Sequence, residues 1–481
     1  MSRIVVIGGG AAGAAVVGEY LRGPPRSDLS LAWVVGNGAP GRGVAYSTTA
    51  DFHLLNVRAA GMGLFADDVC GFLEHLNANG RQVLGGDFVP REWFGDFAEA
   101  TLAKLISDGA RNGAHVELLS SEAIRIQPTP AGHYAVALRD GRTQFADEIV
   151  LALGGLPSAP LDNVSADAMA SGAYLLDPWA MSRRRPPPRE VVVIGTGLSG
   201  VDAALDAASR WPSAHITCVS RHGRLPLPHP REPAAPFAQQ AAFNDALLAA
   251  PNLRAWCRIF RETLEDNAGD IDWRALVDGI RPVTSSLWRS LGGAERRRFL
   301  RHLRWLWEIA RHRMPPKTAQ ALAVLSEENR LSIVAGRIRA IDGDGPLSVK
   351  IAPRGDESER VIDADLVVQA TGFNTNVSTN RHRLLRQLID EGLAVPDEFG
   401  LGLKTDGEGR LVGADDEVIA DIRLVGTLER GALWECSGLP EIRTRARAIV
   451  DAWRRRRSPA IAVALQRWHR DAAAFPGLSL G

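Results

Sequence analysis

The sequence has few cysteines, no long apolar run and no excess of charge of either sign. Its 481 residues include only 4 cysteines. None of them forms a C-x-x-C pair, so we expect buried thiols rather than a redox-active pair. No stretch approaches the roughly 20 apolar residues of a membrane span. A formal net charge of zero argues against nucleic acid as the main partner.

The start of the chain lacks the pattern of a signal peptide, because Met1–Arg3 runs directly into a β-branched strand pattern. We therefore expect a cytoplasmic protein with no membrane association. The sequence also shows no metal-ligand spacing and no ordered Ser-His-Asp series. A chain of 481 residues is long enough for two well-packed domains. Nothing in the sequence indicates an oligomeric state.

Two dinucleotide fingerprints are the most informative feature that is present. Each joins a β-branched run, Ile4–Ile7 or Val191–Ile194, to a glycine-rich turn and an Ala-rich stretch. In such a turn the first glycine allows a tight bend, the second lets the pyrophosphate approach and the third packs helix against strand. A glycine turn that only packs is the alternative at each place. Two such turns predict two dinucleotides, FAD and NAD(P)H, bound by Gly8, Gly10 and Gly13 and by Gly195, Gly197, Ser199 and Gly200.

The residues after the second strand of each unit predict how the adenosine end is bound. An acidic residue often binds the ribose there. The strand His215–Val219 is followed instead by Ser220 and Arg221, a hydroxyl and a guanidinium that suit a 2′-phosphate. NADPH is therefore expected rather than NADH. In the first unit the acid is also missing, which leaves Asn37 or backbone groups to bind the FAD ribose.

The order of these segments predicts an α/β fold with two Rossmann-like dinucleotide-binding domains, the NADP domain inserted into the FAD domain. The expected ranges are 1–180 for the first part of the FAD domain, 188–364 for the NADP domain and 365–481 for the completion of the FAD domain. The late segment Leu366–Gly372 echoes the strand at 149–154, and it adds Thr371 and Gly372 to the expected cofactor contacts. A Trp-rich helical insertion is expected at about 233–328, either as a substrate lid or as a small satellite core.

Together these segments resemble the two-dinucleotide-domain flavoproteins, which include class B flavin monooxygenases and N-hydroxylating monooxygenases. More closely, the chain resembles a bacterial group of FAD/NAD(P)-binding proteins. Beside the fingerprints, the resemblance rests on segments 41–47, 53–57, 89–91, 177–179, 272–274, 299–303 and 434–435. The F-x-G-x-x-x-H signature of flavin monooxygenases is absent, and Leu176–Trp179 stands in its place. The lack of a cysteine pair argues against the disulfide-reductase branch.

The resemblance also suggests site residues near the flavin. Asn56 matches a flavin-side asparagine of related enzymes and is the expected hydrogen-bond donor near flavin N5, with a buried turn residue as the alternative. His53 is a candidate acid or base, although a lone histidine is more often structural. Arg42, between two glycines, suits a phosphate or adenine contact.

The C-terminal part completes the expected flavin site. Gly426 follows a strand pattern, and Pro440 begins a helix whose N-terminus is expected to face the anionic edge of the flavin. Glu435, beside Trp434, is expected to orient this turn.

Together with the two fingerprints, the resemblance implies an NADPH-dependent FAD monooxygenase. It would use O₂ to oxygenate nitrogen or another heteroatom of a small polar amine or amino acid through a C4a-hydroperoxyflavin. Aspartate is a specific case of this interpretation. Two alternatives stay open: a flavin-dependent NADPH dehydrogenase or reductase without oxygen insertion, and a redox-sensing protein that binds both cofactors without turnover.

Overall fold

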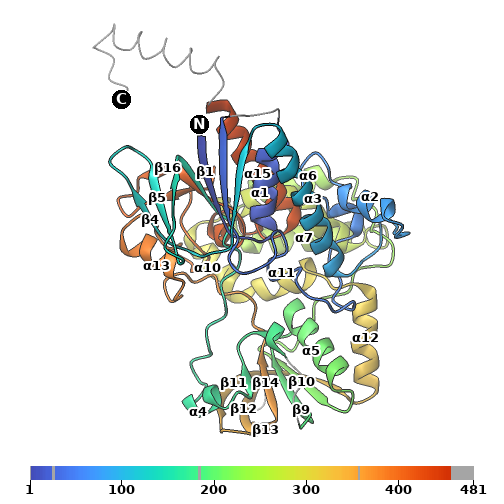
Figure 1. The fold of residues 1–481 in the computed structure, drawn as a ribbon. Coiled ribbons are helices and arrows are strands. Elements are labelled where there is room, and N and C mark those ends of the chain that lie inside the picture. The colour runs from blue at the N-terminus through green and yellow to red at the C-terminus, as the bar shows by residue number, and fades with distance from the viewer. Residues whose placement is uncertain (1, 24–27, 182–185, 356–357, 457–481) are drawn as a thin grey trace.

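A computed structural model describes residues 2–23, 28–181, 186–355 and 358–456, and the expected range 365–481 therefore ends outside the described residues. The described residues form two large sheets, which lie one above the other in Figure 1, a small three-stranded sheet, and a group of helices beside them. The upper sheet has the strand order β15-β16-β7-β1-β2-β3 and is parallel except for β15. Its strands are β1 (Ser2–Ile7), β2 (Leu29–Val34), β3 (His115–Leu119), β7 (Glu148–Leu151), β15 (Arg410–Val412) and β16 (Val418–Leu424).

Both faces of the upper sheet are covered, as the apolar run of β1 requires. Ile4 and Val6 pack with the helices on one face, whereas Val5 and Ile7 pack with the elements on the other. The first face carries α1 (Ala11–Leu21), η1 (Ala59–Gly61), α2 (Gly71–Ala78), α3 (Arg91–Arg111) and α15 (Leu439–Arg456). The other face carries β4 (Ala123–Pro128), β5 (Tyr134–Leu138), β6 (Thr143–Ala146) and α13 (Arg383–Asp390).

The lower sheet repeats this plan around the second fingerprint. Its strand order is β13-β12-β11-β10-β9-β14-β8. The strands are β8 (Tyr174–Leu175), β9 (Glu190–Ile194), β10 (His215–Ser220), β11 (Leu331–Asp342), β12 (Leu347–Pro353), β13 (Arg360–Ala364) and β14 (Leu366–Gln369). On one face lie α5 (Leu198–Arg210) and α12 (Pro316–Glu327), and on the other lies α4 (Ala166–Ala170).

Two strands of the lower sheet fall outside the expected range of the NADP domain, 188–364: β8, which lies in the expected range 1–180, and β14, which lies in the expected range 365–481. β14 pairs in parallel with β9, and β8 pairs with β14. The strand that was expected to begin the completion of the FAD domain therefore belongs to the second sheet. The sequence similarity between β14 and β7 corresponds to a similar position, because each strand pairs with the fingerprint strand of its own sheet, β9 or β1. The first unit thus resumes after β14 rather than at residue 365.

Between β10 and α12 the chain is helical, as expected for about 233–328. The helices are α6 (Gln240–Ala249), α7 (Leu253–Asp266), α8 (Trp273–Gly279), η3 (Arg281–Val283), α9 (Thr284–Ser290), α10 (Gly293–His302) and α11 (Arg304–Arg311). This helical segment has a small core of its own around Leu276 and Ile280. It also packs on the C-terminal part, where Trp288 stacks on Trp434 with ring centroids 4.9 Å apart.

Short elements complete the fold: η2 (Pro178–Ala180), η4 (Thr427–Glu429) and α14 (Arg430–Leu433). None of the helices in the described ranges combines the length and the apolar character that crossing a lipid bilayer requires.

Candidate functional site

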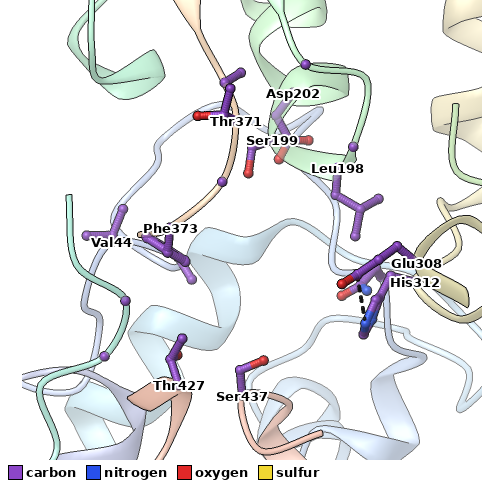
Figure 2. Close-up of a pocket in the computed structure, with 18 of the residues that line it drawn as sticks. Val44, Leu198, Ser199, Asp202, Glu308, His312, Thr371, Phe373, Thr427 and Ser437 are labelled. Atoms are coloured by element: carbon purple, nitrogen blue, oxygen red, sulfur yellow. Dashed lines mark ion pairs between the residues drawn. The ribbon is translucent and has the colours of Figure 1, made fainter. Parts of the chain in front are cut away.

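A large cavity lies where the two sheets and the helical segment meet. Its volume is about 1800 Å³. The turns after β1 and β9 line it, together with loop residues 42–50, the helices α10 and α11, and the segment that leads into α15. Figure 2 shows Leu198 and Ser199 from the second fingerprint on one side of this cavity, with Thr427 and Ser437 from the C-terminal part across from them.

The first fingerprint has two crowded glycines and one open one. Gly8 has φ +126°, and a Cβ there would lie 2.1 Å from the carbonyl oxygen of Ala152. A Cβ on Gly13 would lie 2.0 Å from the carbonyl oxygen of Gly8. A Cβ on Gly10 would instead meet only Gly43 Cα, at 3.6 Å, and Gly10 lines the cavity. The turn therefore leaves space at its middle glycine, where a pyrophosphate needs it.

The second fingerprint has the same geometry. Gly195 also has φ +126°, and its Cβ would lie 2.3 Å from the carbonyl oxygen of Ala370, while a Cβ on Gly200 would lie 2.2 Å from that of Gly195. Nothing lies within 4 Å of a Cβ built on Gly197. The start of α5 faces the cavity through Ser199 (Figure 2), so its free N–H groups are available to an anion. The chain thus provides two dinucleotide cradles on one cavity.

The hydroxyl of Ser220 is used inside its own turn. Thr196 Oγ1 lies 2.7 Å from the carbonyl oxygen of Arg224 and 2.8 Å from Ser220 Oγ. Because a carbonyl only accepts and threonine has one hydroxyl proton, Ser220 donates to Thr196. Its oxygen also accepts from the N–H of Gly223. Ser220 therefore fixes the turn and has no proton left for a phosphate, whereas the neighbouring Arg221 lines the cavity.

Four arginines on the cavity wall have no ion-pair partner among the described residues: Arg221, Arg224, Arg301 and Arg337. Three come from the second unit, and Arg301 comes from α10. The helical segment reaches this place directly, because Trp305 stacks on His222 at 4.4 Å with an interplanar angle of 16°. This end of the cavity is cationic and suits a phosphate group.

His53 is buried between the two units and both of its ring nitrogens are in use. Nε2 lies 3.3 Å from the carbonyl oxygen of Asp202, so it carries the proton, and Nδ1 accepts from Thr48 Oγ1 at 2.7 Å. Burial lowers the pKa of His53. This arrangement supports the structural interpretation of His53 rather than its use as an acid or base.

Asn56 lines the cavity, and its side chain has no hydrogen-bond partner among the described residues. Its backbone carbonyl lies 3.1 Å from Nε2 of His229, and Nδ1 of His229 lies 3.4 Å from Nε of Arg313. Because an arginine only donates, Nδ1 accepts and Nε2 donates to the carbonyl. The backbone of Asn56 is therefore fixed while its amide group stays available.

Arg42 and Asn37 differ in position. Arg42 lines the cavity, but its guanidinium is held by Asp96 at 2.5 Å and Glu99 at 2.9 Å. Burial opposes the charge of Arg42, yet these two hydrogen bonds raise its pKa. Asn37 is exposed and does not line the cavity. Backbone groups of the neighbouring Gly38, which does line it, are better placed toward the ribose.

Most of the C-terminal candidates line the cavity. Gly426 lines it with φ +94°, and Thr371 and Gly372 line it after β14. Pro440 lies in the first turn of α15 and does not itself line the cavity. Glu435 does, and its carboxylate lies 3.1 Å from both Arg311 and the indole nitrogen of Trp307. Glu435 thus ties this turn to α11.

A polar wall formed by α11 and α14 was missed by the sequence analysis. Glu308 and His312 face the cavity side by side (Figure 2), and Arg304 and Arg430 lie against Glu308. Burial alone would raise the pKa of Glu308, but these cationic neighbours lower it. The signal that could have found the wall is helical spacing, since Trp305, Glu308 and His312 recur at three and four residues.

Comparisons with known proteins agree with this geometry. A model of the FAD-NAD(P)-binding family matches residues 5–156. No curated protein sequence matches the chain. Among solved structures, the ornithine N-hydroxylase of Kutzneria sp. is similar, with a TM-score of 0.62 and 18% identity over 95% of this chain and 99% of that chain. The L-lysine 6-monooxygenase of Pseudomonas syringae gives a TM-score of 0.59, 18% identity and the same coverage.

The cadaverine monooxygenase of Erwinia amylovora, solved with bound FAD, gives a TM-score of 0.61 and 11% identity over 93% of both chains. Identities this low compare folds only. The fold that is shared extends over nearly the whole chain, including both fingerprint units and the helical segment. Residues 5–156 thus match the FAD-NAD(P)-binding family, and the chain as a whole shares the fold of these enzymes, with two dinucleotide-binding units.

Proposed function

We propose that this protein is an FAD- and NADPH-dependent monooxygenase that hydroxylates the nitrogen of a small amine or amino acid. The balanced reaction is RNH₂ + O₂ + NADPH + H⁺ → RNHOH + NADP⁺ + H₂O. One observation carries the proposal: both dinucleotide turns open into one cavity that also has a polar wall, so two cofactors and a small substrate can meet. The similar hydroxylases of ornithine, lysine and cadaverine support the same class of reaction.

The residues of the first unit fit FAD. The open space at Gly10 and the start of α1 would receive the pyrophosphate. The turn at Gly426 and the start of α15 would face the flavin ring, where a helix N-terminus stabilises negative charge. When bound, FAD supplies the transfer of electrons from NADPH to O₂. Asn56 would offer its free amide as a hydrogen-bond donor to the flavin.

The residues of the second unit fit NADPH. Gly197 leaves room for the pyrophosphate, and the unpaired Arg221 lies directly after β10, where the adenosine end belongs. Arg224 and Arg337 add positive charge at the same place. A 2′-phosphate would supply the negative charge that these arginines lack among the described residues.

The wall of α11 and α14 would bind the substrate. Among the described residues, the three guanidinium groups of Arg304, Arg311 and Arg430 form ion pairs with two carboxylates, those of Glu308 and Glu435. This excess of positive charge favours a substrate that carries a carboxylate. Within the class of small amino acids we therefore propose aspartate as the first substrate to test.

The test measures NADPH and O₂ consumption by the purified holoprotein with L-aspartate, L-ornithine, L-lysine and cadaverine, and detects hydroxylated product by mass spectrometry. We expect one of these amines to raise NADPH oxidation and to yield one equivalent of product per NADPH. If the enzyme forms one equivalent of hydrogen peroxide per NADPH and no hydroxylated product, the proposal is wrong and the reductase alternative applies. If NADPH fails to reduce the flavin, the redox-sensing alternative replaces it.

A further inference from the structure

His312 combines access to the cavity with a deep position in the protein. It follows the last residue of α11 and lines the cavity beside Glu308 (Figure 2). About a third of its side-chain surface, 34%, stays accessible, and that of Glu308 is 32% accessible. The imidazole can therefore touch a small molecule in the cavity, although protein surrounds it on the other sides.

The two carboxylate oxygens of Glu308 contact different side chains. Its Oε1 lies 2.5 Å from Arg430 and 3.6 Å from Arg304, while its Oε2 lies 3.3 Å from Nε2 of His312. The arginines thus fix the carboxylate through one oxygen and leave the other for the imidazole. Because an ionised carboxylate only accepts, Nε2 carries the proton of a neutral His312. The lone pair is then on Nδ1, which has no hydrogen-bond partner among the described residues.

Burial is the main factor that keeps His312 neutral. Burial lowers its pKa, Glu308 and Glu435 act in the opposite direction, and Arg311 and Arg430 lower the pKa further. The net direction is down from the ordinary value. At neutral pH the imidazole is therefore a base that can accept a proton, and Glu308 is placed to stabilise the imidazolium that results.

Such a base is needed if the substrate is an amine. An alkyl ammonium group, with a pKa of about 10 like that of lysine, has no lone pair with which its nitrogen could react. The group must lose one proton before an N–O bond can form.

We propose that His312 is the catalytic base that removes this proton from the substrate ammonium, with Glu308 as the residue that positions it. The inference rests on the proposed function. In the step, one N–H bond of the ammonium breaks, its electron pair stays on the amine nitrogen, and the proton binds Nδ1 of His312. The imidazolium then returns the proton to water in the cavity, so that neither residue is consumed.

A first experiment measures the tautomer without any turnover. The holoprotein is labelled with ¹⁵N-histidine, and the His312 signal is assigned from its absence in His312→Gln. We expect a neutral ring at pH 7 with the proton on Nε2, and a changed tautomer ratio in Glu308→Gln, because an amide can also donate. An imidazolium at pH 7, or a proton on Nδ1, overturns the proposal, since Nδ1 would then have no lone pair with which to accept the proton.

A second experiment measures the rate of hydroxylated product formation across pH with the amine that gives the most product among the four compounds tested above. Removing a general base typically costs about 10²-fold or more in rate. His312→Gln is expected to show such a loss at pH 7, and the loss should shrink as the pH approaches that of the free amine's own deprotonation. The matched control is His302→Gln, at the exposed end of α10, which should behave like the wild type.

The outcomes separate the two proposals. If the wild type couples an amine and His312→Gln couples it equally well, or loses the same factor at every pH, His312 is not the base and the proposed function stands. If no amine couples in the wild type, the proposed function fails and the role of His312 fails with it.

Discussion

Arg91 and Asp202 form a buried ion pair, 2.7 Å long, that joins the two dinucleotide units. Arg91 begins α3 in the first unit, and Asp202 lies in the first turns of α5, directly after the second fingerprint. The carbonyl oxygen of Asp202 also accepts from His53, so the same short stretch of α5 is fixed twice to the first unit. These two contacts help to fix the relative position of the two cradles, together with the contact of His229 with the Asn56 carbonyl.

Removing one partner of this pair is expected to destabilise the protein. Arg91→Ala leaves the Asp202 carboxylate buried without its counter-charge, which costs about 3 kcal/mol or more. Urea unfolding followed by circular dichroism measures the loss. Arg111→Ala, which removes an exposed partner of Asp108, should change stability by less than about 1 kcal/mol. Equal effects of the two changes would contradict a role for the buried pair.

Gly10→Val is expected to yield protein without flavin. Its side chain would enter the open space at the middle glycine of the first fingerprint, where we place the pyrophosphate. The ratio of flavin to protein absorbance after purification is the measurement. Gly407→Val is the control, because nothing lies within 4 Å of a Cβ built on this exposed glycine, which lies outside the cavity. Full flavin content in Gly10→Val would refute the assignment of the first cradle.

Arg221→Ala is expected to weaken the binding of NADPH but not that of NADH. Loss of a charge-assisted hydrogen bond costs about 1.5–3 kcal/mol, so the apparent constant for NADPH should rise about tenfold or more. The constant for NADH should change little, because it has no 2′-phosphate. Both are measured from the rate of anaerobic flavin reduction. Arg339→Ala, an exposed arginine that does not line the cavity, is the control. An equal rise of the apparent constant for both nucleotides would show that Arg221 does not bind the 2′-phosphate.

Asn56→Ala is expected to divert electrons to hydrogen peroxide. The amide of Asn56 is free toward the cavity and is our candidate donor to the flavin, so its loss should lower product per NADPH severalfold. Peroxide and product are quantified in the same reaction. Asn79→Ala, at the exposed end of α2, should leave the ratio unchanged. An unchanged ratio in Asn56→Ala would favour the turn-residue interpretation.

His229 predicts a pH dependence of stability. Burial and the charge of Arg313 lower its pKa to about 4, against 6.5 for a free histidine. Between these values the unfolded chain binds the proton and the folded protein does not, so His229 lowers stability as the pH falls from about 7 toward 4. His229→Gln should therefore lose less in melting temperature over this range than the wild type. If the melting temperatures of the wild type and of His229→Gln fall in parallel, other groups cause the pH dependence. The control variant His302→Gln should follow the wild type.

Both cradles could be predicted from the sequence because their requirements are local. A glycine with φ +126° and a third glycine against the strand are properties of six consecutive residues, and these appear in the printed order. The position of β14 could not be predicted in this way. Its sequence resembles β7, and only pairing with β9 decides to which sheet it belongs.

The site residues differ in the same way: roles that depend on local sequence could be predicted, and roles that depend on distant contacts could not. Arg221 and Gly426 follow strand ends and were predicted from that position. The roles of Ser220 and His53 depend on groups far away in the sequence, Thr196 and Asp202, which accept the protons that looked available to a ligand. Glu308 and His312 were missed because the helical insertion was expected only as a lid or a satellite core, and none of its residues was singled out as a site residue. Only the fold shows that one face of α11 closes the cavity.

The continuous helical segment has an evolutionary consequence. It supplies Trp305, Glu308 and His312 to the cavity but none of the glycine turns. Under the proposed function, the oxidant is encoded in one set of segments and the choice of substrate largely in another. New specificities could then arise by divergence or exchange of a single insertion, with the ancestral electron-transfer apparatus inherited unchanged. The same modularity makes residues 233–328 the natural unit to transplant between relatives when a hydroxylase for a different amine is sought.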